Sequence, residues 1–206
     1  MYDKIKIEES DYMKEIEILV EVYSNKELVL EKLNKYKFSG IKETLDIYYY
    51  DPKRNNLKPN NANQINECLR LRSSNNKYSI TYKVDKFDSN GKWLYSDEYE
   101  TNIDDIEILK NILEKLGLKE LLRVHNIKEE YIYDEYNIVF EDVKDLGYFL
   151  EVEYCTKDDI DVKKKKLEID EFIKTLELDV SEELNMGKPE MIIRKNNICV
   201  GDRDDI

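Results

Sequence analysis

The segment 14–22 (KEIEILVEV) strongly constrains the fold, because it alternates acidic and apolar residues along its length. Glu15, Glu17 and Glu21 fall on one face, and the branched residues at positions 16, 18, 20 and 22 fall on the other. A period of two in a β-branched run indicates a β-strand with one apolar face. Carboxylates one strand repeat apart are separated by about 6.7 Å, so they either face water or hold a divalent cation together.

The same spacing of like charges recurs in later segments. Further strands are expected at 42–50, 66–73, 77–86, 92–101, 121–133, 136–142 and 148–154. These strands carry the pairs Arg70/Arg72, Glu98/Glu100 and Glu151/Glu153, and the single charges Lys83, Lys128 and Glu141. One wet face of an ordinary antiparallel sheet explains polar alternation. It does not explain why positive and negative charges are segregated by strand.

Helices are expected where capping residues precede amphipathic runs. Ser24-Asn25 precedes one to about residue 37, Asp104-Asp105 precedes one to Leu116, and Asp158-Asp159 precedes one to about residue 176. A short helix around 180–184 and a break at 187–189 (GKP) are expected before a frayed tail at 195–206. Because no linker divides the chain, the sequence predicts one domain over 1–206 with a core of about 14–194.

The charge balance and the cysteines narrow the classes of function. The formal net charge of −13 argues against general binding to nucleic acid or to an anionic membrane surface. The sequence contains no apolar run long enough to predict a membrane span. The three cysteines are widely spaced, which is typical of reduced thiols in a cytoplasmic protein. His125 is the only histidine, so a His-based triad is excluded. The sequence is compatible with a homodimer and does not decide the oligomeric state.

A closed barrel with a polar interior accounts for the segregated charges. Basic strands would bind an anion through charge-assisted hydrogen bonds, and arginine gives bidentate contacts to phosphate. Acidic strands would hold Mg²⁺ or Mn²⁺ against the same anion, because hard cations prefer oxygen ligands. The residues alone leave open a second interpretation: an antiparallel sheet with one solvent-exposed face and no ligand-binding site.

The order of these motifs resembles the CYTH superfamily, the triphosphate-tunnel group that includes class IV adenylate cyclases and thiamine triphosphatases. The ExExK strand of that family is similar to residues 15–19 (EIEIL), and its arginine strand is similar to 69–72 (LRLR). Residues 46–50 (DIYYY), 81–83 (TYK), 98–100 (EYE) and 141–153 (EDVKDLGYFLEVE) resemble other motifs of the family. The resemblance runs from about residue 15 to 193, nearly the whole chain.

The resemblance implies an α+β fold, with a closed antiparallel eight-stranded β-barrel around a tunnel and flanking helices. It implies phosphate contacts from Arg70, Arg72, Lys83 and Lys128. It also implies a Mg²⁺ or Mn²⁺ site formed by Glu15, Glu17, Glu141, Glu151 and Glu153. Glu98 and Glu100 would orient the basic residues or assist a second cation. The partner would be a small-molecule triphosphate: a nucleoside triphosphate, thiamine triphosphate or inorganic triphosphate.

One position departs from the family pattern. The lysine of ExExK, a phosphate contact and a proposed catalytic group in relatives, is Leu19 in this chain. Lys14, Lys53 and Arg54 are the substitutes that the sequence offers, although Lys14 alternates onto the opposite face. The catalytic residue is therefore not assigned. Two hypotheses follow: a metal-dependent triphosphate hydrolase or adenylate cyclase, and a module that binds a triphosphate or polyphosphate without turnover.

Overall fold

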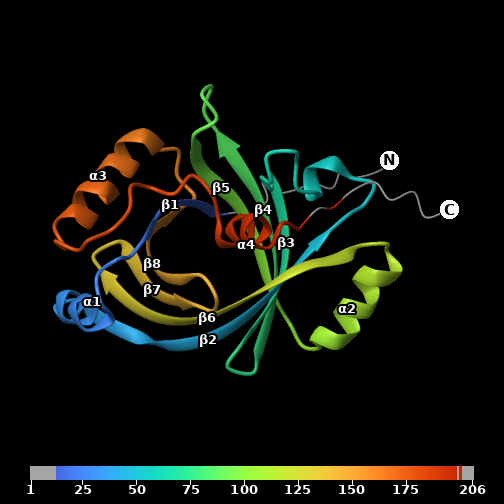
Figure 1. Ribbon diagram of the computed structural model, residues 1–206, viewed down its shortest axis with the longest axis horizontal. Helices are drawn as coiled ribbons and strands as arrows, with labels where there is room; N and C mark the ends of the chain where they lie inside the picture. The colour runs from blue at the N-terminus through green and yellow to red at the C-terminus, as the bar shows by residue number, and fades with distance from the viewer. Residues whose placement is uncertain (1–12, 199, 201–206) are drawn as a thin grey trace, which may run out of the picture.

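Eight antiparallel strands close into a barrel in the computed structural model, which describes residues 13–198 and residue 200 (Figure 1). Around the barrel the strands follow the order β1-β5-β4-β3-β2-β6-β7-β8. Their bounds are β1 (Met13–Glu21), β2 (Lys37–Tyr50), β3 (Glu67–Ser74), β4 (Lys77–Phe87), β5 (Trp93–Ile103), β6 (Lys119–Tyr133), β7 (Tyr136–Val143) and β8 (Gly147–Thr156). The closed antiparallel barrel expected from the sequence is confirmed.

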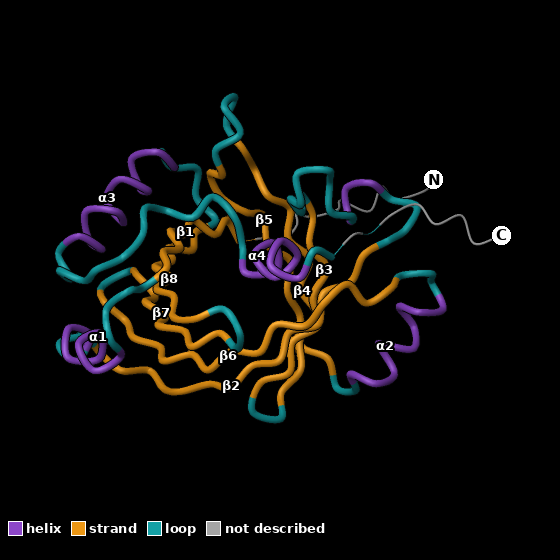
Figure 2. Tube along the Cα trace, in the orientation of Figure 1, coloured by secondary structure: helices purple, strands orange, loops and turns teal. Residues whose placement is uncertain are grey.

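Within the described part of the chain, four α-helices and one short 3₁₀ helix lie outside or across this barrel (Figure 2). They are α1 (Lys26–Leu33), η1 (Asn55–Leu57), α2 (Ile106–Lys115), α3 (Val162–Lys174) and α4 (Lys188–Asn196). The cap residues explain where the first three α-helices begin. Asn25, Asp105 and Asp161 each accept hydrogen bonds from backbone N–H groups in the first turn of the helix that follows.

Strand β1 closes the barrel, because it pairs with β5 on one side and with β8 on the other. In the β1–β8 register Glu17 lies opposite Glu153, and Leu19 lies opposite Glu151. Two acidic strands distant in sequence therefore become neighbours. The other face of β1 packs outward: Ile16 and Ile18 are buried in an apolar cluster that includes Val29 of α1 and Phe172 of α3. Period-two alternation thus separates the core from the barrel interior.

Helix α4 covers one end of the barrel. Its Ile193 is fully buried in a cluster with residues of five strands: Leu19, Tyr48, Val124, Val143 and Phe149. The sequence predicted a short helix around 180–184, which is wrong, because that segment lies extended along β1. Val180 forms an antiparallel bridge with Val22, and the Leu184 N–H donates to the Leu19 carbonyl.

The chain becomes helical only after Gly187, where Pro189 near the helix start and Glu190 favour a helix N-terminus. Of the expected frayed tail, Lys195 and Asn196 belong to α4, whereas residues 199 and 201–206 lie outside the described residues.

Candidate functional site: a charged tunnel

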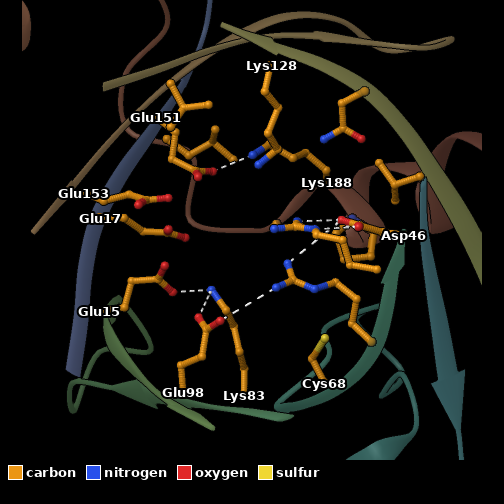
Figure 3. A pocket seen from close by; sticks show the side chains of 18 of the residues that line it. Glu15, Glu17, Asp46, Cys68, Lys83, Glu98, Lys128, Glu151, Glu153 and Lys188 are labelled. Atoms are coloured by element: carbon orange, nitrogen blue, oxygen red, sulfur yellow. Dashed lines mark hydrogen bonds and ion pairs between the residues drawn. The ribbon is translucent and has the colours of Figure 1, made fainter. Parts of the chain in front are cut away.

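The barrel encloses a cavity of about 440 Å³ with a strongly charged wall. Most of the site residues predicted from the sequence line it: Glu15, Glu17, Arg70, Arg72, Lys83, Glu98, Glu100, Lys128, Glu151 and Glu153. Figure 3 shows Glu15, Glu17 and Glu153 on one side of this cavity, and Lys128, Lys188 and Asp46 reaching it from other directions. The closed barrel therefore brings together side chains from strands that are far apart in sequence.

Arg70 has donors that no carboxylate holds closely. Its Nη2 donates to Thr81 Oγ1 at 3.0 Å, and carboxylate oxygens of Glu100 and Glu98 lie 3.6 and 3.7 Å from the same nitrogen. Its Nε is buried without a hydrogen-bond partner. A guanidinium at a cavity whose terminal nitrogen no carboxylate holds closely is suited to binding a phosphate.

Arg72 is held differently from Arg70. Its Nε and Nη2 donate to the two oxygens of Asp46 at 2.7 and 2.8 Å, which is a bidentate pair. Burial raises the pKa of Asp46, but the hydrogen bonds from Arg72 outweigh it and lower that pKa to about 2. Asp46 therefore stays ionised and fixes the Arg72 guanidinium in one orientation, with less of its hydrogen-bonding capacity free for a ligand than in Arg70.

Lys83 bridges two carboxylates of neighbouring strands. Its Nζ lies 2.9 Å from Glu98 Oε2 and also contacts Glu15 Oε2. Burial raises the pKa of Glu15 to about 7, while the pKa of Glu98 falls to about 2 because Lys83 outweighs its own burial. Glu98 thus neutralises Lys83 at neutral pH. This arrangement supports the predicted role of Glu98 in orienting a basic residue.

A cluster of three carboxylates faces the basic residues. Ligand oxygens of Glu17, Glu151 and Glu153 all lie within 4.8 Å of one another. Burial, followed by the charge of Glu151, raises the pKa values of Glu17 and Glu153 well above the usual range. Glu151 moves the other way, because Lys188 and Lys128 offset its burial and lower its pKa. Crowded buried carboxylates suit a hard divalent cation, which would remove their mutual repulsion.

A second group includes Glu15, Glu153 and Cys155, whose ligand atoms also lie within 4.8 Å of one another. Glu153 is common to both groups, so a cation held by either would contact it. Glu141, which the sequence placed in the metal site, belongs to neither group.

The carboxylate cluster predicts an unusual pH dependence of stability without metal. A carboxyl group whose pKa is raised in the folded protein stabilises the fold below its unfolded pKa of about 4.3. That contribution is lost as pH rises through the folded pKa, which is about 7 for Glu15 and raised for Glu17 and Glu153. We therefore expect the unfolding temperature in EDTA to fall between about pH 5 and about pH 8. With saturating Mn²⁺ this fall should shrink, and equal pH profiles in scanning calorimetry would contradict the cation site.

Lys188 is a site residue that the sequence did not indicate. It is the first residue of α4, and its side chain is only 11% exposed. Its Nζ lies 2.6 Å from Glu141 Oε1 and also contacts Glu151 Oε2. The segment 187–189 reads as a simple break, and no local pattern places its lysine inside the barrel. Only the position of α4 across the barrel end does so.

The position of Leu19 explains why this residue is apolar. Leu19 is 2% exposed in the cluster beneath α4. Two of the substitutes considered for the missing lysine do not replace it, because Lys14 pairs with Asp159 at 3.5 Å and Arg54 pairs with Glu67 at 3.1 Å. Lys188 instead brings an ammonium group to Glu151, the residue paired with Leu19 across β1 and β8.

We expect Leu19→Lys to destabilise the protein without raising its activity. A lysine there would replace apolar contacts under α4 and add a second cation near Lys188, at a cost of about 2–4 kcal/mol. Urea unfolding measures this loss, and Leu19→Met serves as the control because it conserves volume and apolar character. A Leu19→Lys protein as stable as the wild type, with faster turnover of a triphosphate, would show that the missing lysine limits this chain.

Among the described helices, none combines the length and apolar character needed to cross a membrane. A closed eight-stranded antiparallel barrel with acidic strands facing basic ones defines a class of charged-tunnel proteins. The family model of the CYTH domain matches residues 13–186. The chain belongs to the CYTH domain family, which confirms the resemblance seen in the sequence.

The similar proteins include one curated relative and several solved structures. The protein named "Putative adenylate cyclase MJ0240" of Methanocaldococcus jannaschii is 33% identical over 186 residues, which cover 89% of this chain and 96% of that protein. The PH1819 protein of Pyrococcus horikoshii OT3 superposes with a TM-score of 0.72 at 26% identity, over 87% of this chain and 99% of that chain.

A more distant structure shares the fold alone. HpAC1 of Hippeastrum, described as a putative adenylyl cyclase with a dominant triphosphatase activity, has a TM-score of 0.60 at 16% identity. The match covers 90% of this chain and 97% of HpAC1.

Proposed function

We propose that the tunnel binds a small-molecule triphosphate together with Mg²⁺ or Mn²⁺, and that the protein hydrolyses or cyclises this substrate. One observation carries the proposal: a crowded group of buried or part-buried carboxylates (Glu17, Glu151, Glu153) shares a cavity with five buried or part-buried cations. The cations are Arg70, Arg72, Lys83, Lys128 and Lys188. A metal–triphosphate complex needs both kinds of group at once, because the cation takes carboxylate oxygens and the phosphates take basic donors.

The residues of this chain supply binding and orientation. Arg70 offers a guanidinium that no carboxylate holds closely. Lys128 and Lys188 offer ammonium groups near Glu141, and Lys83 offers one near Glu15 and Glu98. A phosphate chain bound among them would be held at several points, which restricts its motion and aligns the reacting phosphorus. A divalent cation at the carboxylate cluster would supply charge neutralisation and activate a nucleophile.

Similar proteins support both reactions. MJ0240 carries the name of an adenylate cyclase, and HpAC1 is described with a dominant triphosphatase activity. The two reactions share the phosphate and cation contacts but differ in the nucleophile, which is a ribose hydroxyl in cyclisation and water in hydrolysis. The phosphate-binding groups therefore favour a triphosphate as substrate, but they are the same for cyclisation and for hydrolysis. We also propose a cytoplasmic location, in keeping with the free Cys68 and Cys155.

A substrate screen with product identification tests the proposal. The protein is incubated with ATP, thiamine triphosphate or inorganic triphosphate, and each is combined with Mg²⁺ or Mn²⁺. We expect metal-dependent release of phosphate or pyrophosphate from at least one of them. A cyclic nucleotide identifies the cyclase reaction, and orthophosphate identifies hydrolysis. No product and no binding of any of the three would contradict the proposal.

The second candidate is a binding module that holds a triphosphate or polyphosphate without turnover. The observation that favours it is Leu19, which cannot bind phosphate or transfer a proton. Titration calorimetry run alongside the screen separates the two candidates. Tight, metal-dependent binding without product supports the binding module, whereas turnover excludes it.

A further inference from the structure

Glu141 is the most enclosed carboxylate among the described residues. It is 0% exposed, and it does not line the cavity although it lies on the inner face of β7. Its Oε2 accepts a hydrogen bond from Asn126 Nδ2 at 2.7 Å. Its Oε1 lies 2.6 Å from Lys188 Nζ and 3.4 Å from Lys128 Nζ. Both carboxylate oxygens of Glu141 therefore accept a hydrogen bond, and the Lys128 ammonium group lies near one of them.

These contacts separate Glu141 from the carboxylates that can share a cation. Glu17, Glu151 and Glu153 form the close oxygen cluster, and Glu141 is in neither of the two clusters found among the described residues. A cation at Glu141 would have to displace the ammonium group of Lys188 or Lys128. The displaced ammonium group would then lie inside the barrel without its carboxylate partner, which is energetically unfavourable.

The buried position of Lys188 requires an anion that stays in place. Only Glu141 and Glu151 contact its ammonium group among the described residues. Glu151 also belongs to the cation cluster, so a bound cation would share its charge. Glu141 lies outside the cation cluster, so a bound cation would not draw its charge away from Lys188. Asn126 fixes its carboxylate from the far side, which limits where the Lys188 ammonium can lie.

We propose that Glu141 is a positioning residue for Lys188 and not a ligand of the cation. Held by Asn126, it fixes the ammonium group of Lys188 at the α4 end of the tunnel, where that group faces the phosphate chain. This inference rests on the proposed function for the phosphate contact, and it departs from the metal role that the sequence suggested for Glu141.

Binding of inorganic triphosphate in EDTA tests the positioning role, because simple electrostatics predicts the opposite sign. Removing a negative charge near a polyanion should tighten binding, whereas losing the anchor of Lys188 should weaken it. We expect Glu141→Gln to weaken binding by about 10-fold or more, as measured by calorimetry. In a Lys188→Met background the same substitution should leave affinity unchanged or raise it, because no ammonium group is left to position.

Glu130→Gln is the matched control for charge. Glu130 lines the cavity and pairs with Lys42 at 2.6 Å, not with Lys188. Its loss should leave triphosphate affinity unchanged or raise it. Equal weakening by Glu130→Gln and Glu141→Gln, or equal effects of Glu141→Gln with and without Lys188, would overturn the proposal.

Binding of Mn²⁺ without triphosphate tests the second half of the proposal. Electron paramagnetic resonance of free Mn²⁺ gives the affinity directly and needs no turnover. We expect Glu141→Gln to stay within about 2-fold of the wild type, and Glu17→Gln to lose about 10-fold or more. Equal losses in the two variants would make Glu141 a cation ligand and overturn the proposal.

Two further measurements keep the test decisive. If Glu141→Gln fails to fold, Glu141→Asp keeps the charge and withdraws the oxygens from Lys188, so triphosphate binding should weaken while Mn²⁺ binding holds. Wild-type protein that binds Mn²⁺ but no triphosphate would contradict the proposed function, and the Mn²⁺ arm would still decide whether Glu141 is a cation ligand.

Discussion

Glu17→Gln is expected to lower metal-dependent turnover by about 100-fold or more, because it removes a charged oxygen ligand from the centre of the cation cluster. The metal-free protein should respond in the opposite direction. Glu17 is buried beside Glu151, and its pKa is raised by burial first and by that neighbouring charge second. A neutral glutamine relieves this repulsion, so the unfolding free energy in EDTA should rise by about 1–3 kcal/mol.

The triphosphate screen measures the loss of turnover, and scanning calorimetry with and without Mn²⁺ measures the change in stability. Wild-type protein should gain stability from Mn²⁺, and Glu17→Gln should gain little, because ligand binding stabilises only a fold that binds the ligand. Glu130→Gln is the control, since its carboxylate lies in the same cavity but pairs with Lys42. A Glu17→Gln protein with normal Mn²⁺ stabilisation would contradict the cation cluster.

Lys188→Met is expected to have the largest effect on stability and to weaken triphosphate binding as well. The substitution leaves the carboxylates of Glu141 and Glu151 without the ammonium group between them. Breaking a buried ion pair from one side costs about 3–5 kcal/mol. The loss of one phosphate contact, together with two carboxylate charges that Lys188 no longer neutralises, should lower the affinity for inorganic triphosphate by about 100-fold.

Urea unfolding and calorimetry measure the two effects separately, with binding recorded well below the unfolding temperature. Lys195→Met is the matched control, because Lys195 lies on the same helix but is exposed. It should change stability by less than about 0.5 kcal/mol. If Lys188→Met bound triphosphate as tightly as the wild type, α4 would contribute no phosphate contact.

Much of the tunnel could be predicted because its wall follows a local rule. A strand turns successive side chains to opposite faces, so Glu15 and Glu17 share a face wherever the strand lies. The same rule places Arg70 with Arg72 and Glu151 with Glu153. The family pattern then supplied the order of these strands, and the barrel in the structure has that closed form.

Helix α4 shows where this local rule ends. Residues 180–184 look helical in isolation, but their backbone hydrogen bonds to β1 hold them extended. The helix begins only at Lys188, and its burial depends on apolar residues that five strands contribute. No window of the sequence contains both sides of that contact, so neither Lys188 in the tunnel nor the packing role of Leu19 could be predicted.

Local patterns in the chain were enough to predict the strands and the face on which each charged pair lies, and the order of those patterns indicated the family. Tertiary structure decided which charges meet. Closing the barrel set Glu17 against Glu151 and Glu153, and placing α4 across its end brought Lys188 between Glu141 and Glu151. The physical reason is one of range: side-chain alternation depends on adjacent residues, whereas a buried charge depends on every element that surrounds it.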